Sequence, residues 1–350
     1  MHILIYGECE MYGTGAWCYF QAFEDMGYDV YSYSPIKFLE KYQKSVFYKV
    51  IKKVNNGYFS DDLRKHQDGF IEVAKKLKPN IIVVLKGLLL NHVVIERLKK
   101  NAFIVLINHD DFFSKFKNST SNVLFKSLGY YDHIFVTKKV NVKEIQKYNN
   151  NVSFFQFSYY PKIHNIPRYN SEDEKIWSAD IVFIGNSYPK RIRQLRYLVN
   201  NLGSKYKIRI YGGNWNKIST IELKESIDNK YLYPDDLKKA IYYSKISLCF
   251  LCEENRDEYT QRTFEIPACG GFLMAENTSM HKLLFRNGTD AILFDDNNDE
   301  DLLLKVVELL EDSTKREQIR NNGIKAVQKY EYTYAARISE IVSLYLKKQV

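Results

Sequence analysis

The chain contains 350 residues, of which 51 are Lys or Arg and 42 are Asp or Glu, so its formal net charge is +9. Apolar residues make up 45% of the chain and aromatic residues 15%, which is enough for packed cores and excludes a disordered or fibrous protein. The length indicates about two domains, and the longest apolar runs, residues 81–85 and 88–90, are far shorter than the roughly 18 residues of a membrane span.

The first half of the chain alternates between expected strands and helices. Short apolar stretches predict strands at residues 3–6, 28–33, 81–85, 103–107, 133–136 and 152–157. Residues 16–26 carry apolar side chains at helical spacing and are followed by Gly27, a common helix end. A second helix is expected to begin near Ser60 and to stop before Pro79.

Between residues 161 and 178 this alternation lapses into prolines, asparagines and charged residues, which predicts a linker. Beyond it, strands are expected at residues 181–184, 208–211, 246–252, 272–275 and 291–294, and helices around 190–201, 235–244, 260–269, 299–311, 314–329 and 333–347. Continuous apolar strands that alternate with helices predict parallel sheets covered on both faces. The expected fold class is therefore α/β, with two doubly wound Rossmann-like domains and a cleft between them, and with ligands bound beyond the carboxyl ends of the strands.

The number of cysteines and the net charge indicate in which cellular compartment the protein works and which partners it binds. Five cysteines, an odd number, favour a reducing compartment, and the N-terminus shows no secretory signal, so a cytoplasmic location is expected. Cys249 and Cys252 lie in an apolar stretch and the histidines lack zinc-ligand spacing, so no metal and no other cofactor is expected. The mild, scattered positive charge does not indicate a dedicated nucleic-acid interface, and no nucleic-acid partner is expected. It leaves open a basic face for an anionic substrate, or peripheral association with the inner face of the membrane.

Residues 255–276 are the stretch richest in groups that carry chemistry. A polar loop follows a buried strand, and a helix is expected to begin near Tyr259 or Thr260. Free backbone N–H groups in a first helical turn bind anions, and Arg262 adds a positive charge suited to phosphate. Glu265 lies about one and a half turns beyond Thr260, where a carboxylate suits the paired hydroxyls of a ribose or sugar. The alternative is a capped surface helix with an unrelated acidic residue.

Residues 260–276 resemble the hallmark of the spore-maturation CgeB-like glycosyltransferases, a family similar to the GT-B-fold transferases that use nucleotide-sugars. The resemblance implies that Thr260, Arg262 and Thr263 contact the donor. It continues through shorter stretches at residues 180–191, 211–215, 244–247, 284–288 and 333–337. It therefore covers most of residues 180–340, whereas the N-terminal half is similar only in its pattern of elements.

The resemblance also implies roles for two acidic residues that are separated by seven others. In the wider group the second acid contacts the ribose of the nucleotide and the first contacts the donor sugar. Asp257 and Glu265 have this spacing. The usual first acid is Glu, and Glu258 is the immediate neighbour of Asp257, so either side chain can be the one that reaches the sugar.

Further donor contacts are implied at the ends of two strands. Gly185 and Asn186 lie in the loop after the first strand of the second domain, where the backbone and Arg191 would meet the diphosphate. Tyr211 and Gly212 end the next strand, and glycine there permits close approach of a ligand. A tight turn is the alternative for these glycines.

The first domain offers two loops at strand ends. Gly13 and Gly15 enter a helix N-terminus and could face the diphosphate or the acceptor, although a lone G-x-G lacks the rest of a dinucleotide fingerprint. His109, Asp110 and Asp111 follow a predicted strand. His109 could donate to a donor-sugar hydroxyl, and Asp110 or Asp111 could take the acceptor proton. A helix cap is the alternative for the aspartates.

These features predict a glycosyltransferase that moves a sugar from a nucleotide-diphosphate donor, with UDP-sugars favoured, to a hydroxyl of a glycan, protein or lipid-linked acceptor. The paired acids resemble the retaining group, which favours retention of configuration. The first domain has no Asp-x-Asp at a strand end, so the charge of the leaving group is expected to be neutralised by Arg and a helix dipole rather than by a metal. The alternatives are a nucleotide-sugar epimerase or hydrolase on the same fold, and a non-catalytic sugar-binding coat module.

The expected domains are an acceptor-side domain at residues 1–165 and a nucleotide-sugar-binding domain at residues 178–332. Residues 333–350 carry apolar side chains at near-helical spacing and end in lysines. In folds that resemble this one the terminal helix crosses back to the N-terminal domain, and the same is expected here. The alternative is a helix packed only on its own domain.

Overall fold

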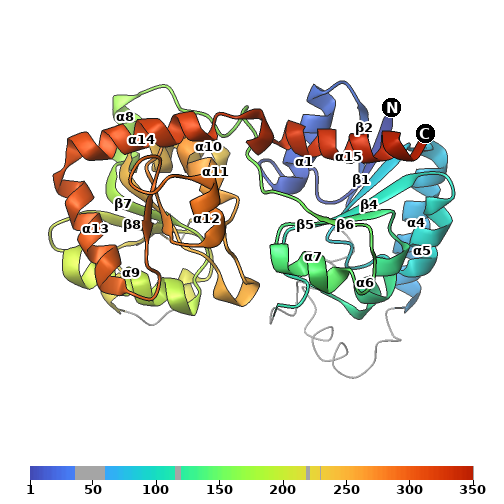
Figure 1. Ribbon diagram of the computed structural model, residues 1–350, viewed down its shortest axis with the longest axis horizontal. Coiled ribbons are helices and arrows are strands. Elements are labelled where there is room, and N and C mark those ends of the chain that lie inside the picture. Colours follow the sequence, from blue (N-terminus) through green and yellow to red (C-terminus); the bar gives the residue numbers. More distant parts are fainter. Residues whose placement is uncertain (36–59, 115–119, 218–220, 229, 350) are drawn as a thin grey trace. The chain divides into compact units, whose positions relative to one another are not determined.

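The computed structural model describes residues 1–35, 60–114, 120–217, 221–228 and 230–349. The chain forms two compact units: a first unit of residues 1–156 and 334–350, and a second unit of residues 157–333 (Figure 1). The passage from one unit to the other lies at residues 156–157, before the expected linker at residues 161–178. Each unit is built on a parallel sheet with flanking helices, which confirms the predicted α/β class with two Rossmann-like domains.

The sheet of the first unit has six parallel strands in the order β2-β1-β3-β4-β5-β6. These strands are β1 (His2–Tyr6), β2 (Asp29–Tyr33), β3 (Ile81–Leu85), β4 (Phe103–Asn108), β5 (His133–Val136) and β6 (Val152–Phe154). The central strands β3 and β4 are buried on both faces, as their unbroken apolar sequences predict. The strand order reverses between β1 and β3, so their carboxyl ends form the switch point at which such sheets bind ligands.

The helices of the first unit are α1 (Gly15–Asp25), α4 (Ser60–Leu77), α5 (His92–Lys99), α6 (Asn122–Ser127), α7 (Lys139–Ile145) and α15 (Tyr334–Gln349). Three of them begin after a short polar residue, Thr14, Asn91 or Ser121, whose side chain accepts a backbone N–H of the first turn. Figure 1 shows α15, from the end of the chain, lying beside α1. There the rings of Tyr19 and Tyr334 meet edge to face with their centroids 4.8 Å apart.

The sheet of the second unit also has six parallel strands, in the order β12-β11-β10-β7-β8-β9. These strands are β7 (Ala179–Ile184), β8 (Ile208–Tyr211), β9 (Ile227–Asp228), β10 (Ser244–Cys249), β11 (Leu273–Glu276) and β12 (Ile292–Phe294). The sequence did not predict β9, because an edge strand of two residues is too short to show a period. The switch point of this sheet lies between β7 and β10.

The helices of the second unit are α8 (Ser171–Trp177), α9 (Pro189–Leu202), α10 (Pro234–Tyr242), α11 (Arg262–Ala268), α12 (Ser279–Leu284), α13 (Asp299–Glu311) and α14 (Ser313–Val327). The segment expected to be a linker therefore belongs to this unit and contains α8. Asn170 caps that helix by accepting the N–H groups of Glu172 and Asp173, and of its residues only Trp177 is buried. The charged residues that suggested a loop thus form the solvent-exposed face of the short helix α8. The helix α12 was likewise not predicted.

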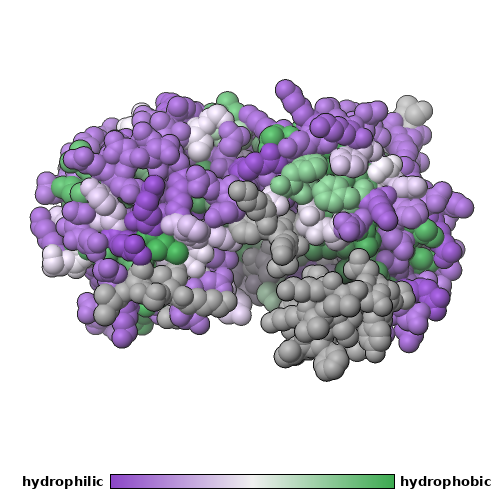
Figure 2. Space-filling model, turned by 90° about the horizontal axis from the view of Figure 1, so that it is seen from below, coloured by the Kyte–Doolittle hydropathy of each residue, from purple (hydrophilic) through white to green (hydrophobic). Residues whose placement is uncertain are grey.

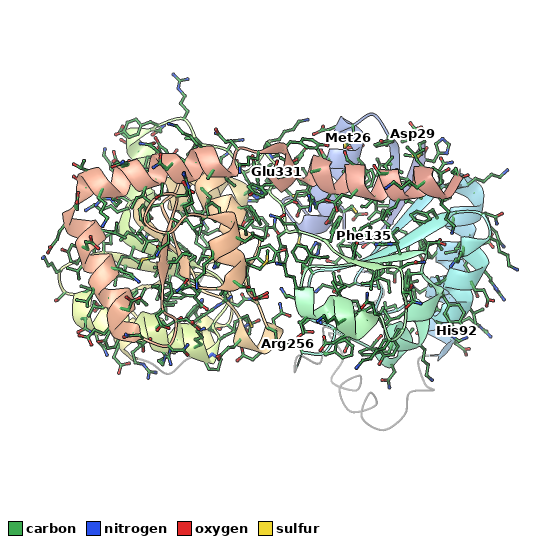
Figure 3. The ribbon with its side chains drawn as sticks, viewed as in Figure 1. Met26, Asp29, His92, Phe135, Arg256 and Glu331 are labelled. Atoms are coloured by element: carbon green, nitrogen blue, oxygen red, sulfur yellow. The ribbon has the colours of Figure 1, made fainter. Side chains whose placement is uncertain are left out.

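Each unit has its own apolar core. In the first unit Phe135 points into the interior (Figure 3), and its ring centroid lies 4.3 Å from that of Phe155. In the second unit the rings of Phe183 and Phe250 stack with their centroids 5.3 Å apart. Hydrophilic side chains cover most of the face shown in Figure 2. Among the residues that the structure describes, no helix combines the length and the apolar composition required to cross a membrane.

Candidate functional site

The carboxyl ends of β7 and β10 lie next to each other in the second sheet, because these two parallel strands pair directly. The chain continues outward from β7 through β8 on one side and from β10 through β11 on the other, which makes this edge the switch point of the sheet. Folds of this kind bind ligands at such an edge. The loops after β7 and β10 both begin here, and together with the helices α9 and α11 that follow them they hold most of the predicted donor-binding residues.

The loop after β7 packs tightly against the loop after β8. The indole N–H of Trp215 donates to the Gly185 carbonyl at 2.8 Å, and the N–H of Gly213 donates to the Asn186 side chain at 3.0 Å. Gly212 has φ +126°, and a Cβ added there would lie 2.2 Å from the Gly185 carbonyl oxygen. These glycines therefore allow two loops of the chain to meet, and the expected contacts of Gly185, Asn186 and Gly212 with a ligand stay a prediction.

Arg191, in the first turn of α9, is buried between two loops. Its Nε donates to the Leu251 carbonyl at 3.1 Å, and a terminal guanidinium nitrogen donates to the Asn186 carbonyl at 3.1 Å. Its guanidinium carbon also lies 5.0 Å from the ring centroid of Tyr188. Arg191 thus joins the loops after β7 and β10, and its contact with a diphosphate stays a prediction. Tyr211, at the end of β8, is fully buried, and burial raises the pKa of its phenol to about 12.

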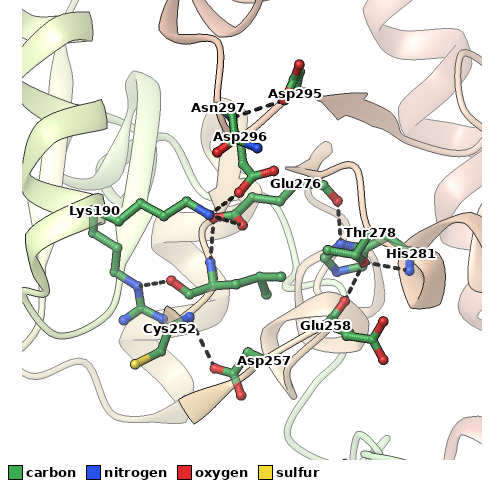
Figure 4. A network of polar contacts seen from close by, with 12 residues as sticks. Lys190, Cys252, Asp257, Glu258, Glu276, Thr278, His281, Asp295, Asp296 and Asn297 are labelled. Atoms are coloured by element: carbon green, nitrogen blue, oxygen red, sulfur yellow. Dashed lines mark hydrogen bonds and ion pairs between the residues drawn. The ribbon is translucent and has the colours of Figure 1, made fainter. Parts of the chain in front are cut away.

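A buried ion pair that sequence reasoning missed lies at the same edge (Figure 4). Glu276, at the end of β11, accepts the N–H of Leu251 at 2.9 Å and lies 2.9 Å from the Nζ of Lys190. Lys190 also pairs with Asp296. Burial raises the pKa of Glu276. Burial opposes the charge of Lys190 as well, but its hydrogen bonds to the two carboxylates raise its pKa. The available signal was position, since Glu276 directly follows a predicted strand and Lys190 begins the helix predicted after another.

Asp257 and Glu258, the two candidates for the sugar contact, face different parts of the unit. The Asp257 carboxylate accepts the N–H of Cys252 at 3.2 Å and the side-chain amide of Asn255 at 2.9 Å, and so closes the turn after β10. The carboxylate of Glu258 instead accepts the hydroxyl of Ser279 in α12. Figure 4 shows the two side chains pointing apart. Which of them meets a sugar stays a prediction.

The turn that leads into α11 is fixed by two threonines. The helix begins at Arg262, slightly later than expected, and the N–H of Thr260 donates to the Thr263 hydroxyl at 3.1 Å. Nδ1 of His281 lies 2.7 Å from the carbonyl of Glu276, which can only accept, so Nδ1 carries the proton. The Nε2 of His281 therefore accepts from the Thr263 hydroxyl at 3.0 Å. Because Thr263 is fully buried, its visible role is to shape this turn.

Glu265 is held by charged and polar partners on both carboxylate oxygens. Its Oε2 pairs with Arg262, one turn earlier in α11. Its Oε1 lies 3.2 Å from the Nε2 of His164, a residue for which the sequence suggested no role. Glu265 and His164 are 6% and 3% exposed, whereas about a quarter of the Arg262 side chain is exposed. Arg262 and Glu265 therefore pair with each other at the start of α11, and the contacts that the sequence predicted for them, with the diphosphate and the ribose, stay predictions.

The loop after β1 forms a turn that leads into a capped helix. Gly13 has φ +78°, a conformation that favours glycine, and the Thr14 hydroxyl donates to the carbonyl of Met11 at 2.9 Å. The same hydroxyl oxygen accepts the N–H of Trp17 at 3.2 Å. Gly15 begins α1, where an added Cβ would lie 3.4 Å from the Tyr334 hydroxyl. Contacts of Gly13 and Gly15 with a ligand stay a prediction.

His109 and Asp110 follow β4 at the carboxyl edge of the first sheet. The Nε2 of His109 lies 3.3 Å from the Tyr19 hydroxyl, and burial lowers the pKa of its imidazole to about 4. Asp110 pairs with the Nζ of Lys86 at 2.7 Å. Although burial acts to raise the pKa of Asp110, the charge and hydrogen bond of Lys86 lower it overall. Near neutral pH this edge therefore presents a neutral imidazole beside an ionised carboxylate.

Asp111, in contrast, is fully buried. Its Oδ1 accepts the side-chain amide of Asn141 at 2.7 Å and the N–H of Phe113 at 2.9 Å. These contacts cap a turn, whereas the alternative to a catalytic role that the sequence offered was a helix cap. Of the two aspartates, Asp110 has the more accessible carboxylate.

The described part of the chain offers no ready-made metal site. Within those residues, no three His, Cys, Asp or Glu side chains are grouped so that they could hold an ion. The five cysteines are buried free thiols.

Comparison with known proteins supports this description of the fold. Residues 191–343 match the model of a family described as glycosyl transferase-like. Sucrose-phosphate synthase from Thermosynechococcus elongatus has a similar structure, with TM-score 0.69 and 13% identity over 99% of this chain and 98% of that one. HepE from Anabaena, in a structure with UDP and glucose, gives TM-score 0.68 and 12% identity over 98% and 99% of the two chains.

An α-glucosyltransferase in complex with UDP-glucose and DNA gives TM-score 0.64 and 14% identity over 99% of each chain. A search of curated proteins finds none that matches the sequence. The structural matches span both units, and the family match spans most of the second unit and α15. The chain therefore has the GT-B fold, and residues 191–343 are similar to the glycosyl transferase-like family.

Proposed function

We propose that the protein transfers a sugar from a nucleotide-diphosphate donor to an acceptor hydroxyl. The observation that carries this proposal is the pairing of Arg262 with Glu265 at the start of α11, within the glycosyl transferase-like segment. A guanidinium suits the diphosphate and a carboxylate suits the ribose hydroxyls. Breaking the bond to the sugar leaves an anionic nucleotide, so stabilising that charge is the main electrostatic task of the site.

We infer a UDP-sugar as the donor and retention of configuration as the outcome. Support for the donor comes from HepE and the α-glucosyltransferase, whose structures contain UDP or UDP-glucose. Support for retention comes from the spacing of Asp257 and Glu265. The same motif supports assignment to the CgeB-like type within the glycosyltransferases.

The first unit supplies the groups proposed to act on the reacting hydroxyls. A neutral His109 donates to a hydroxyl of the donor sugar, and Asp110 accepts the proton of the acceptor. The acceptor is a glycan, a protein or a lipid-linked molecule. We place the reaction in the cytoplasm, in line with five buried free thiols, with peripheral association at the membrane as the accompanying proposal.

A thermal-shift series with UDP-, GDP-, dTDP- and CMP-sugars tests the donor, because a ligand that binds the folded state raises the melting temperature. Product analysis of the best donor, with and without candidate acceptors, then tests transfer. Release of free sugar without any transfer to the acceptors would favour the hydrolase alternative, and an altered sugar still attached to the nucleotide would favour the epimerase. Absence of a shift with every nucleotide would overturn the proposal in favour of a non-catalytic module.

We propose that the reaction needs no metal, with Arg262 neutralising the leaving group. Activity measured in EDTA should then equal activity without it. Loss of activity that manganese or magnesium restores would overturn this part of the proposal.

A further inference from the structure

His164 lies on the segment that precedes α8 and packs against α11 within the second unit. The ends of this packed segment are tied down: the N–H of Phe157 donates to the Tyr259 hydroxyl at 3.1 Å, and a Cβ added at Gly270 would lie 3.1 Å from Ile166. His164 is outside the glycosyl transferase-like segment, residues 191–343, although its side chain reaches into it.

The hydrogen bonds of His164 assign its tautomer. Its Nδ1 lies 3.0 Å from the backbone nitrogen of Tyr160, and a backbone N–H can only donate, so Nδ1 is the acceptor. A neutral imidazole then carries its proton on Nε2, which faces Glu265 Oε1 at 3.2 Å. His164 therefore donates to the carboxylate, and the backbone of Tyr160 orients the ring.

The two partners of Glu265 differ in how firmly they hold it. Arg262 is partly exposed on a long, flexible side chain, and its guanidinium is the group that a diphosphate would engage. His164 is buried, has a short side chain and is fixed at its other ring nitrogen. A buried carboxylate requires hydrogen-bond partners, so His164 is the partner that keeps Glu265 satisfied when Arg262 turns toward a ligand.

We propose that His164 is a positioning residue that holds the Glu265 carboxylate in the orientation required to bind the ribose of the donor. This inference rests on the proposed function, because it gives a role to a residue that acts only through Glu265. It means that nucleotide affinity depends on the segment around His164, which lies before the glycosyl transferase-like segment in the sequence.

Two conservative variants separate the two ring nitrogens of His164. In His164→Asn the amide occupies the place of Nδ1, so it retains the bond to the Tyr160 N–H but cannot reach Glu265. In His164→Gln the amide nitrogen occupies the place of Nε2 and still donates to Glu265. We expect His164→Asn to weaken UDP binding at least tenfold and His164→Gln to remain within threefold of wild type, as measured by titration calorimetry.

A nucleotide that lacks the ribose hydroxyls distinguishes loss of the Glu265 orientation from general damage to the binding site. Binding of 2′,3′-dideoxy-UDP, which lacks both hydroxyls, should be the same in wild type and His164→Asn. Equal loss of both ligands, or unchanged UDP binding by His164→Asn, overturns the inference. If His164→Asn fails to fold, a tenfold loss of UDP affinity in folded His164→Gln overturns it, and retained affinity supports it.

Glu265→Gln separates this inference from the proposed function. Weakened UDP binding by Glu265→Gln together with normal binding by His164→Asn overturns only the role of His164. Unchanged UDP binding by Glu265→Gln, or absence of nucleotide binding by the wild type, overturns the nucleotide site itself and the inference with it.

Discussion

The two units share one architecture but carry very different charge. The first unit, residues 1–156 and 334–350, has 25 Lys and Arg against 16 Asp and Glu, a net +9, whereas the second has 26 of each and is neutral. Eight of the first unit's lysines fall in residues 36–59 and 115–119, outside the described residues. The whole charge excess of the chain therefore belongs to the first unit, and any long-range attraction of anionic partners originates there.

The polar groups at the carboxyl edges of the two sheets also differ. The second unit places charged pairs at its edge, Lys190 with Glu276 and Arg262 with Glu265. The first unit places there an imidazole whose pKa is lowered to about 4 by burial, beside the Asp110 carboxylate. A neutral unit that binds an anionic donor must do so through individual cations, whereas a neutral imidazole suits proton and hydrogen-bond chemistry.

The largest effect is expected from breaking the buried pair in the second unit. Lys190→Ala removes the cation beside the buried Glu276 carboxylate, which should lower the free energy of unfolding by about 3 kcal/mol at pH 7. The folded pKa of Glu276 is already raised, so ionisation of this carboxyl lowers the stability of the folded state as pH rises through that pKa, and loss of the Lys190 cation increases this cost. The deficit of the variant should therefore shrink toward about pH 5, where Glu276 protonates more readily.

Urea unfolding at both pH values measures this difference. Lys205→Ala is the matched control, because Lys205 and Glu311 lie 3.8 Å apart and both are exposed. It should change stability little at either pH. Equal losses in the two variants would contradict the structural role given to Lys190.

Two neighbouring aspartates in the first unit are expected to differ in their effect on stability, because Asp111 caps a turn whereas Asp110 is proposed to act on the acceptor. Asp111→Ala removes the acceptor of the Phe113 N–H and one of the two acceptors of the Asn141 amide, which also donates to Glu144, and should cost about 2 kcal/mol of stability. Asp110→Ala breaks only a partly exposed pair with Lys86 and should cost less than ~1 kcal/mol. Thermal unfolding of the two variants checks this order, and the reverse order would show that Asp111 is not the structural one.

Arg262→Ala tests whether the neutral unit binds its donor through single cations. It should weaken nucleotide binding more than tenfold, because a charge-assisted contact is worth roughly 1.5–3 kcal/mol. Arg193→Ala is the control, since Arg193 lies in the same unit, is half exposed and pairs with Asp299 at 3.2 Å. Calorimetric titration with UDP should show a loss only in the first variant. A similar loss in both would mean that overall charge, rather than the position of Arg262, determines affinity.

The smallest expected effect is that of His109→Gln on stability, and it appears only at acidic pH. Its folded pKa of about 4 lies below the ordinary value of about 6.5, so the unfolded chain binds this proton first. Stability should fall as pH drops from about 6.5 to about 4, and His109→Gln should make this decline less steep while matching wild type at pH 7. The other histidines whose pKa values burial lowers, His66, His133, His164 and His281, contribute to the slope that remains. Identical pH profiles for the two proteins would show that His109 keeps its ordinary pKa.

Much of the fold could be predicted from local pattern. The bounds of β3 and β5 agree with the prediction because β3 is an unbroken apolar run and β5 has three successive apolar residues, with polar residues on either side. The helix α8 was missed because its charged residues face solvent and leave only Trp177 buried, so no apolar period is visible. Two-residue β9 and short α12 were missed because elements of that length carry too few apolar positions to form a period.

The sequence by itself determined the alternation of strands and helices and the motif that places Arg262 near Glu265, because apolar period and residue spacing are local properties of the chain. Only the tertiary structure decided how the polar groups are used. It turns Arg191 toward backbone carbonyls, buries Asp111 beside Asn141, and brings His164 to Glu265 from a segment far away in the sequence. The physical reason is that a buried polar group takes whichever partner folding brings within hydrogen-bond distance, and residue type and spacing do not specify that partner.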